Sequence, residues 1–236
     1  MLFRSGEAWS PTPQPRGGKT DFFEVVYSQG MAEFRSRRNG LAVQMDVTVS
    51  PEDDLEVRRI TLSNLRERMR TVEMTTFAEL ALAPGNSEAA HPAFNGLFIE
   101  TEAIPEHAAL LAHRRPRAPD EAGIWVWHTL AVRGGHVQGG PSFETDRARF
   151  LGRGRDAARP AALDARGPLS GTVGRVLDPA MAIRKRILLQ AGETVTLYAL
   201  MGAAERREDV VRLLEKYRDP RLSERVFDLA WTHSQA

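Results

Sequence analysis

The sequence predicts a mainly β fold: a large antiparallel β-sandwich followed by two C-terminal helices. Two observations carry this prediction. Apolar and polar residues alternate along several segments in the first two thirds of the chain, and turn-forming residues separate those segments. Towards the C-terminus the apolar residues change to helical spacing. We therefore expect residues 1–203 to form the sandwich and residues 204–236 to form a helical segment.

The alternating segments are the predicted strands, because apolar residues at every second position mark a half-buried strand. They cover residues 41–49, 56–64, 71–82, 97–104 and 124–132. Residues 183–190 and 194–202, joined by Ala-Gly-Glu, predict a late β-hairpin. Residues 83–96 are rich in Gly, Pro, Asn and Ser and predict a long loop. Residues 10–19 and 134–141 predict shorter loops rich in Pro and Gly.

The C-terminal segment predicts two helices. Residues 206–218 carry apolar side chains three and four positions apart. Residues 219–235 begin with Asp219, a predicted N-cap, followed by a proline at the first helical position. Phe227 and Trp231 lie four positions apart, beside the main apolar stripe of this second helix.

Composition argues against several classes of function. The chain has no cysteine and six histidines, none of them in metal-ligand spacing, so we expect no metal and no cofactor. A formal net charge of +1 provides no field that would attract nucleic acid, and the basic run 113–117 is interpreted as a solvated face. No segment has the apolar length of a membrane span or a signal peptide, which predicts a cytoplasmic protein without direct membrane contact.

Residues 143–160, FETDRARFLGRGRDAARP, raise the question of a phosphate-binding loop. Gly152 and Gly154 resemble the start of a dinucleotide fingerprint. However, no apolar strand leads into them, and Pro160 stands where the following helix should run. From the residues alone, this segment is an irregular turn with solvated arginines.

Pairs of carboxylates raise the question of glycosidase chemistry. Glu100 and Glu102 stand two positions apart on a predicted strand, as do Glu144 and Asp146, so each pair is expected on one face. Such pairs are common on charged strands, and nothing in the sequence favours one of them. The residues alone therefore identify no active site.

Long segments of the chain resemble the β-sandwich region of cyclic β-1,2-glucan synthases. The resemblance runs from about Ser5 to Gln235, and its segments are SGEAWSPTPQP, VSPEDDLEVRRITLSN, AHPAFNGLFIETE, FETDRARFLGRGR, PLSGTVGRVLDPAMAIRKRILLQAGET and LLEKYRDPRLSERVFDLAWTHSQ. They are also similar to the N-terminal domain of the family 94 glycoside phosphorylases, which include cellobiose phosphorylase. The resemblance implies a galactose-mutarotase-like supersandwich, then linker helices, then an (α/α)6 barrel that carries the general acid and the phosphate site.

The resemblance also implies that this chain is a fragment of a glycosyltransferase or glycoside phosphorylase. The family has strands ahead of the first matching segment and a barrel after the linker helix, and neither has a counterpart in the 236 residues. No catalytic residue is therefore expected in this chain alone.

Candidate site residues follow from the same resemblance. The family stretch FLG-x-x-R matches residues 150–155 and belongs to a loop near the junction with the barrel. The implied substrate-binding or domain-interface residues are Arg149, Gly152, Arg153 and Arg155. Arginines there are suited to barrel carboxylates, sugar hydroxyls or phosphate. Phe227 and Trp231, on the helix that leads to the barrel, are the implied barrel-docking residues.

The leading prediction is a non-catalytic, carbohydrate-associated sandwich domain. Its expected partners are a β-glucan oligosaccharide and the catalytic barrel of the parent enzyme, and its exposed apolar helix predicts self-association. The resemblance implies a parent enzyme that is associated with the bacterial inner membrane. Two alternatives stay open. A stand-alone mutarotase-like or hydrolase-like enzyme would need His128 to converge with Glu100 and Glu102, and an independent carbohydrate-binding module would need exposed aromatics along a groove.

Overall fold

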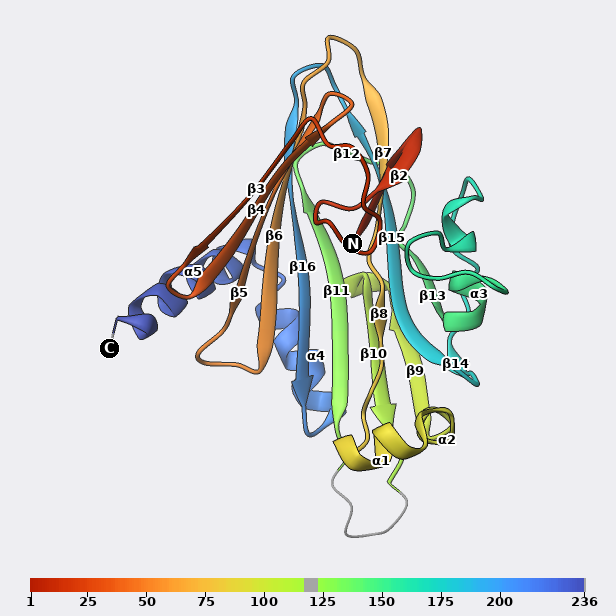
Figure 1. Ribbon diagram of the computed structural model, residues 1–236. Coiled ribbons are helices and arrows are strands. Elements are labelled where there is room, and N and C mark those ends of the chain that lie inside the picture. The colour runs from red at the N-terminus through yellow and green to blue at the C-terminus, as the bar shows by residue number, and fades with distance from the viewer. Residues whose placement is uncertain (117–122, 236) are drawn as a thin grey trace.

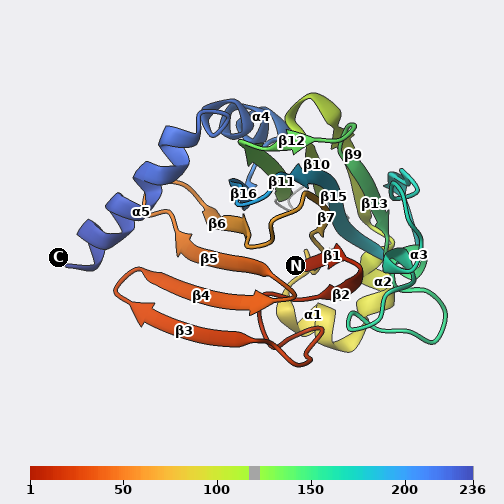
Figure 2. The same ribbon diagram turned by 90° about the horizontal axis from the view of Figure 1, so that it is seen from above.

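The computed structural model describes residues 1–116 and 123–235 and confirms the predicted β-sandwich with C-terminal helices. A seven-stranded sheet and a nine-stranded sheet pack face to face, and neighbouring strands run antiparallel (Figure 1). Two helices lie along the outer side of the larger sheet (Figure 2).

The bounds of the elements are as follows. The larger sheet contains β3 (Phe22–Ser28), β4 (Met31–Arg38), β5 (Leu41–Val49), β6 (Leu55–Asn64), β9 (Ile99–Ile104), β10 (Ala109–Arg114), β11 (Trp125–Arg133), β14 (Gly174–Arg175) and β16 (Thr194–Ala204). The smaller sheet contains β1 (Leu2–Ser5), β2 (Glu7–Trp9), β7 (Arg70–Thr75), β8 (Ala78–Glu79), β12 (His136–Val137), β13 (Ser142–Asp146) and β15 (Pro179–Leu189). The helices are α1 (Gly85–Ala90), α2 (Pro92–Gly96), α3 (Arg147–Leu151), α4 (Arg207–Lys216) and α5 (Pro220–Ser234), with 3-10 turns η1 (Pro105–His107) and η2 (Ala161–Leu163).

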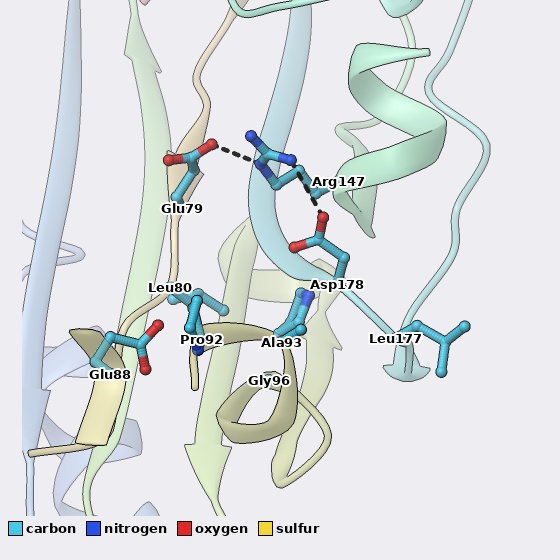
Figure 3. Close-up of a pocket in the computed structure, with 10 residues that line it drawn as sticks. Glu79, Leu80, Glu88, Pro92, Ala93, Gly96, Arg147, Leu177 and Asp178 are labelled. Carbon is cyan, nitrogen blue, oxygen red and sulfur yellow. Dashed lines mark hydrogen bonds and ion pairs between the residues drawn. The ribbon is translucent and has the colours of Figure 1, made fainter. Parts of the chain in front are cut away.

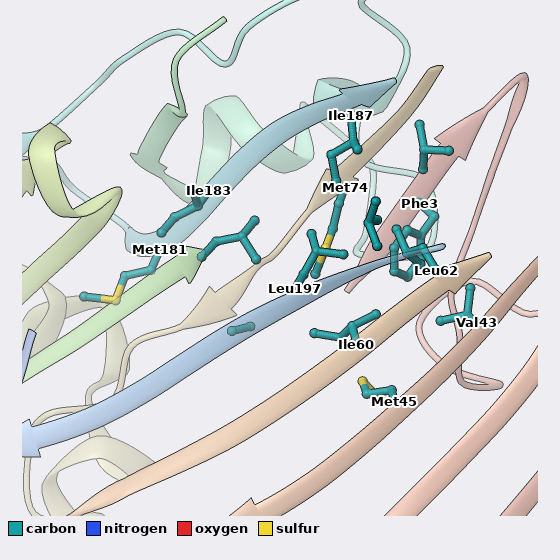
Figure 4. Packing of buried hydrophobic residues seen from close by; sticks show 14 of the residues in the cluster. Phe3, Val43, Met45, Ile60, Leu62, Met74, Met181, Ile183, Ile187 and Leu197 are labelled. Atoms are coloured by element: carbon teal, nitrogen blue, oxygen red, sulfur yellow. The ribbon is translucent and has the colours of Figure 1, made fainter. Parts of the chain in front are cut away.

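The strand order places long strands at the centre of each sheet. The larger sheet runs β14-β9-β10-β11-β16-β6-β5-β4-β3. The smaller sheet runs β12-β15-β7-β1-β2, and β13 and β8 also pair with β15. The main core fills the space between the sheets, where Ile60 and Leu62 of β6 face Met74 of β7 and Ile183 and Ile187 of β15 (Figure 4). All five side chains are fully buried, and each such burial stabilises the fold by about 1.5–3 kcal/mol.

The predicted late hairpin is wrong in its pairing, although both of its strands exist. β15 pairs with β7, β12 and β13 in the smaller sheet, whereas β16 pairs with β6 and β11 in the larger sheet. The turn between them therefore carries the chain from one sheet to the other. Alternation identifies the face of a strand that is buried, but it does not identify the neighbouring strand.

Two other segments differ from the prediction. Residues 71–82 are divided into β7 and β8: the Thr76 N–H still donates to the carbonyl of Ile183, but the Ile183 N–H donates to the Thr76 hydroxyl. Residues 83–96 form α1 and α2 in place of a loop. Gly, Pro, Asn and Ser are frequent in loops, but Pro, Asn and Ser also begin helices, so composition alone could not distinguish the two.

The two C-terminal helices predicted from the apolar spacing are confirmed as α4 and α5. Asp219 caps α5 by accepting a hydrogen bond from the backbone N–H of Arg221 at 3.0 Å. α5 lies over the outer faces of β5 and β4. Arg59 of β6 holds it there through ion pairs with Asp46 and Glu224, and the Arg59 guanidinium lies 4.4 Å from the ring centroid of Phe227.

Candidate functional site

A cleft of about 520 Å³ lies where α1, α2, α3 and the start of β15 meet (Figure 3). Four segments that are distant in the sequence supply its lining. These residues are Glu79, Leu80, Glu88, Pro92, Ala93, Gly96, Arg147, Leu177, Asp178 and Pro179. Gly96 lets α2 approach β15 closely, since a Cβ at this position would stand 3.2 Å from the Cδ of Pro179.

Arg147, the first residue of α3, is the only cation among the described residues that line the cleft. Its Nε donates to Glu79 Oε1 at 2.6 Å and its Nη1 to Asp178 Oδ2 at 3.2 Å. The hydrogen bond to Glu79 is the main cause of a raised pKa of Arg147. Glu88 has no side-chain partner in the part of the chain that the structure describes. Three carboxylates against one guanidinium therefore leave the cleft with net negative charge.

This lining is suited to a neutral ligand with many hydroxyl groups. Carboxylates accept and guanidinium groups donate the hydrogen bonds that sugar hydroxyls make. Net negative charge disfavours phosphate and other anions. Leu177, which is 80% exposed, adds an apolar surface at the rim. Within residues 1–116 and 123–235 no aromatic side chain lines the cleft, so a sugar ring would be held without stacking.

Of the arginines that the resemblance singled out, Arg149 lies in α3, Arg153 and Arg155 lie on the loop after it, and none of them lines this cleft. Arg149 donates through Nη1 to Thr172 Oγ1 at 3.2 Å. Arg155 is ion-paired with Asp164 inside the same loop. Arg153 is exposed and has no hydrogen bond or ion pair within the described ranges. The three side chains therefore form no common site.

The loop that carries these arginines is fixed to the sandwich. Gly152 has φ +84°, and a Cβ there would stand 2.6 Å from the Cβ of Ala161. Arg4 and the buried Arg184 donate to backbone carbonyls between residues 162 and 167 at 2.5–2.8 Å. The loop and α3 therefore present a fixed surface, on which Arg149 and Arg153 are exposed.

Sequence reasoning missed Arg147, Glu79 and Asp178. The signal for Arg147 lay inside the arginine–glycine segment, directly after the residue that caps α3. Its two acidic partners are 68 and 31 residues away in the sequence, so no local pattern could reveal them.

The residues required by the alternative of a stand-alone enzyme do not converge. Glu102 shares a register position with Trp127 across β10, on the outer face of the larger sheet beneath α4. His128 follows Trp127 and therefore points to the opposite face, between the sheets. Its Nδ1 contacts the carbonyl of Leu200 at 2.9 Å and its Nε2 contacts Thr76 Oγ1 at 2.7 Å. Burial lowers the pKa of His128 to about 4.

The paired carboxylates have structural partners. Glu100 forms ion pairs with Arg115 and Arg175, and Glu102 forms one with Arg207. The hydrogen bond from Arg207 is the main cause of the lowered pKa of Glu102. These contacts join β9 to β14 and to α4.

The second carboxylate pair is separated by a β-bulge. The register of β13 shifts between Glu144 and Asp146, so the two side chains have different surroundings. Glu144 is buried and accepts a hydrogen bond from the Ser170 hydroxyl. Asp146 caps α3 by accepting from the backbone N–H groups of Ala148 and Arg149. In the described part of the chain, no three His, Asp or Glu side chains gather as a metal site requires.

The basic run 113–117 is partly engaged in contacts. The His113 ring stacks on Trp125 with centroids 4.1 Å apart, and Arg115 is paired with Glu100. Arg117 lies outside the described residues. Among the helices described, none is long and apolar enough to cross a membrane.

Comparison with known proteins gives a consistent result. The model of the glycosyl hydrolase 94 supersandwich domain matches residues 3–220. The chain is 34% identical over 234 residues to the cyclic beta-(1,2)-glucan synthase NdvB of Rhizobium meliloti (strain 1021), covering 98% of this chain and 8% of that protein. It is 26% identical over 216 residues to the solabiose phosphorylase of Paenibacillus borealis, covering 92% of this chain and 27% of that protein.

Among solved structures, a putative kojibiose phosphorylase from the human microbiome shares the fold, with a TM-score of 0.51 at 7% identity. The match covers 99% of this chain and 27% of that one. The chain thus spans about a quarter or less of the length of these relatives, with 8% for the synthase and 27% for the two phosphorylases. It belongs to glycosyl hydrolase family 94, whose supersandwich domain it matches over almost its whole length.

Proposed function

We propose that this chain is a non-catalytic, carbohydrate-associated domain of a cytoplasmic glucan-processing enzyme, and that it supports the active site of a helical barrel. The relatives named above are a glucan synthase and glycoside phosphorylases that are several times longer than this chain. The barrel is the proposed site of the chemistry, and the sandwich is proposed to shape the entrance to it.

One observation carries the proposal of a non-catalytic role. The acids and the base that could act on a glycosidic bond are already used in structural contacts within the described residues. Glu100 and Glu102 are paired with arginines, Asp146 caps a helix, Glu144 is buried against Ser170, and His128 is enclosed between the sheets. A general acid and base must instead face a substrate within hydrogen-bonding distance.

Three surfaces are proposed to meet the partners. The cleft around Arg147 is the proposed contact for a β-glucan oligosaccharide, because Glu88 has no partner among the described residues there and Leu177 is exposed. The outward side of α5 is the proposed contact for the barrel, since Trp231 is 54% exposed beside the buried Val226. Arg149 of α3 and Arg153 of the loop after it are proposed as a separate contact for the barrel, on the side of the smaller sheet.

Calorimetric titration with short β-1,2-linked glucans tests the carbohydrate role, with cellobiose and maltose as controls. We expect selective binding with a Kd on the order of 1 mM, typical of a shallow polar cleft without stacking. Glu88→Ala should weaken binding by about tenfold, because a hydrogen bond to a charged group is lost. Glu67→Ala, which removes an exposed carboxylate outside the cleft, serves as the matched control. Equal heats for all three sugars, or equal loss in both variants, would reject the cleft as the binding site.

A further inference from the structure

β3 is a long open edge. It is the last strand of the nine-stranded sheet, has seven residues and is paired with β4 on one side only. The other edge strands, among the described strands, are shorter: β14, β12 and β8 have two residues each, β2 has three and β13 has five. An unpaired edge presents a row of backbone N–H and C=O groups that another strand can bind.

Apart from the single charge of Glu24, the usual protective features are absent from β3, all of whose residues the structure describes. Natural edges are blocked by lysine, proline, bulges or a covering element. β3 reads FFEVVYS, with Glu24 as its only charge, and its register with β4 runs unbroken from Phe22↔Arg37 to Ser28↔Met31. Large apolar side chains on both of its faces are open to solvent: Phe22 is 42% exposed, Phe23 37%, Val26 41% and Tyr27 77%.

The position of β3 leaves room for another strand. The β3–β4 hairpin extends away from the smaller sheet, and in both views no other described element lies beyond β3 (Figures 1 and 2). α5 covers β5 and β4 on the outer face and leaves the edge of β3 open. A strand from outside can therefore continue the larger sheet.

The β3 sequence is complementary to itself in one antiparallel register. With Val25 opposite Val25 of a second copy, Phe23 lies opposite Tyr27 on one face. On the other face Glu24 lies opposite Val26, so the two Glu24 carboxylates do not oppose each other. Aromatic cross-strand pairs add about 0.2–1 kcal/mol each, and this register contains two of them.

We propose that β3 pairs with β3 of a second copy of this chain, antiparallel and centred on Val25, and so joins the two larger sheets into one. This complementarity identifies a second copy of the chain as the partner, because the register places aromatic side chains opposite each other and keeps the two Glu24 carboxylates apart. This inference is independent of the proposed function, which concerns glucan and barrel contacts at other surfaces.

Sedimentation equilibrium over about 1 µM to 1 mM chain measures the affinity of the dimer. Charged substitutions at position 26 then test the proposed register. Val26→Glu sets a new carboxylate opposite Glu24 of the other copy, at two symmetric places in the dimer, and so adds two repulsions. Val26→Lys sets an ammonium group at the same two places and so adds two attractions. Both substitutions remove the same exposed valine. We expect dimerisation of V26E to be at least about tenfold weaker than that of V26K.

A charge reversal separates pairing between copies from effects within one chain. Val26 also faces Glu33 of β4, so V26E places two carboxylates close together inside the hairpin. The double variant E24K/V26E keeps that internal repulsion and adds one to Arg35, the ion-pair partner of Glu24 on β4, but it restores opposite charges between copies. We expect it to recover dimerisation to within about threefold of V26K. Thermal melts of each variant verify that the hairpin is folded.

Val173→Glu is the matched control, because Val173 is 43% exposed and lies outside β3. We expect it to dimerise as the unaltered chain does. The proposal is overturned if the unaltered chain remains monomeric over the whole range. It is equally overturned if V26E, V26K and V173E associate with the same affinity, because the contact between copies would then lie elsewhere.

Discussion

At the scale of single residues, buried polar groups tie the two sheets together. His128 of β11 reaches Thr76 of the smaller sheet at 2.7 Å. Asn64, which is fully buried, donates to the carbonyls of Arg68 at 2.9 Å and Gln190 at 2.8 Å. Buried polar atoms are costly unless they are paired, so these contacts favour one alignment of the sheets over others.

His128 makes the stability of the chain depend on pH. Burial lowers its pKa from 6.5 to about 4 in the folded state, while the unfolded chain keeps a value near 6.5. As pH falls below 6.5, the unfolded chain binds a proton that the folded chain does not, so stability is present above pH 6.5 and is lost towards pH 4. Between about pH 7 and pH 5 we expect this group to remove about 2 kcal/mol from the free energy of unfolding.

Urea unfolding at several pH values measures this effect, with His128→Gln as the comparison. Glutamine keeps a polar side chain but does not titrate. The variant should be less stable at pH 7 and should lose about 2 kcal/mol less between pH 7 and pH 5. Parallel pH profiles for the two proteins would contradict the assignment of this dependence to His128.

Gly152 and Gly154 differ in how much an added side chain would cost. Both have positive φ, +84° and +69°, but only Gly152 has an atom close to the position of a Cβ. Gly154→Ala should destabilise the chain by about 1 kcal/mol, through the backbone conformation alone. Gly152→Ala should cost about 2–4 kcal/mol, because φ +84° with ψ 158° suits only glycine and the new methyl also meets Ala161. Equal melting temperatures for the two variants would show that the loop is not packed as described.

At the scale of elements, one side of α5 packs against the sandwich and the other side is exposed to solvent. Val226 is 2% exposed in the cluster beneath α4 and α5, whereas Trp231 is 54% exposed. Val226→Ala should lower the free energy of unfolding by about 2 kcal/mol, from lost burial and a residual cavity. Trp231→Ala should change it by less than about 0.5 kcal/mol. Denaturant titration of the two variants checks this, and a large loss in the tryptophan variant would mean that its ring is part of the core.

Elements were predictable where one face is buried and the other is not. The strands β5, β6, β9 and β11 and the helices α4 and α5 follow their apolar periodicity closely. β3 does not show that alternation, because apolar side chains are exposed on both of its faces. β15 and β16 were recognisable as strands, but they enter different sheets because the choice of neighbour depends on contacts distant in the sequence.

At the scale of the whole molecule, the resemblance predicted the fold, and the comparisons confirm the family. The candidate site was less predictable. The cleft is assembled from residues around 79, 88–96, 147 and 177–179, and although the resemblance covered most of these segments, it gave none of their residues a role in a site. Arg155 was selected because it matches the family stretch FLG-x-x-R, but a sequence match could not show that Asp164 already neutralises it.

The central claim is that the chain binds glucan but does not catalyse its cleavage or synthesis. The most direct test is to incubate the purified chain with β-1,2-linked oligosaccharides and inorganic phosphate and to follow glucose 1-phosphate and glucan length by NMR. Spectra of the same sample report binding through shifts of the sugar signals. The structure and the family lead us to expect shifted sugar signals, no glucose 1-phosphate and unchanged glucan length. Formation of glucose 1-phosphate by the chain alone, or sugar signals that do not respond to it at all, would contradict the claim.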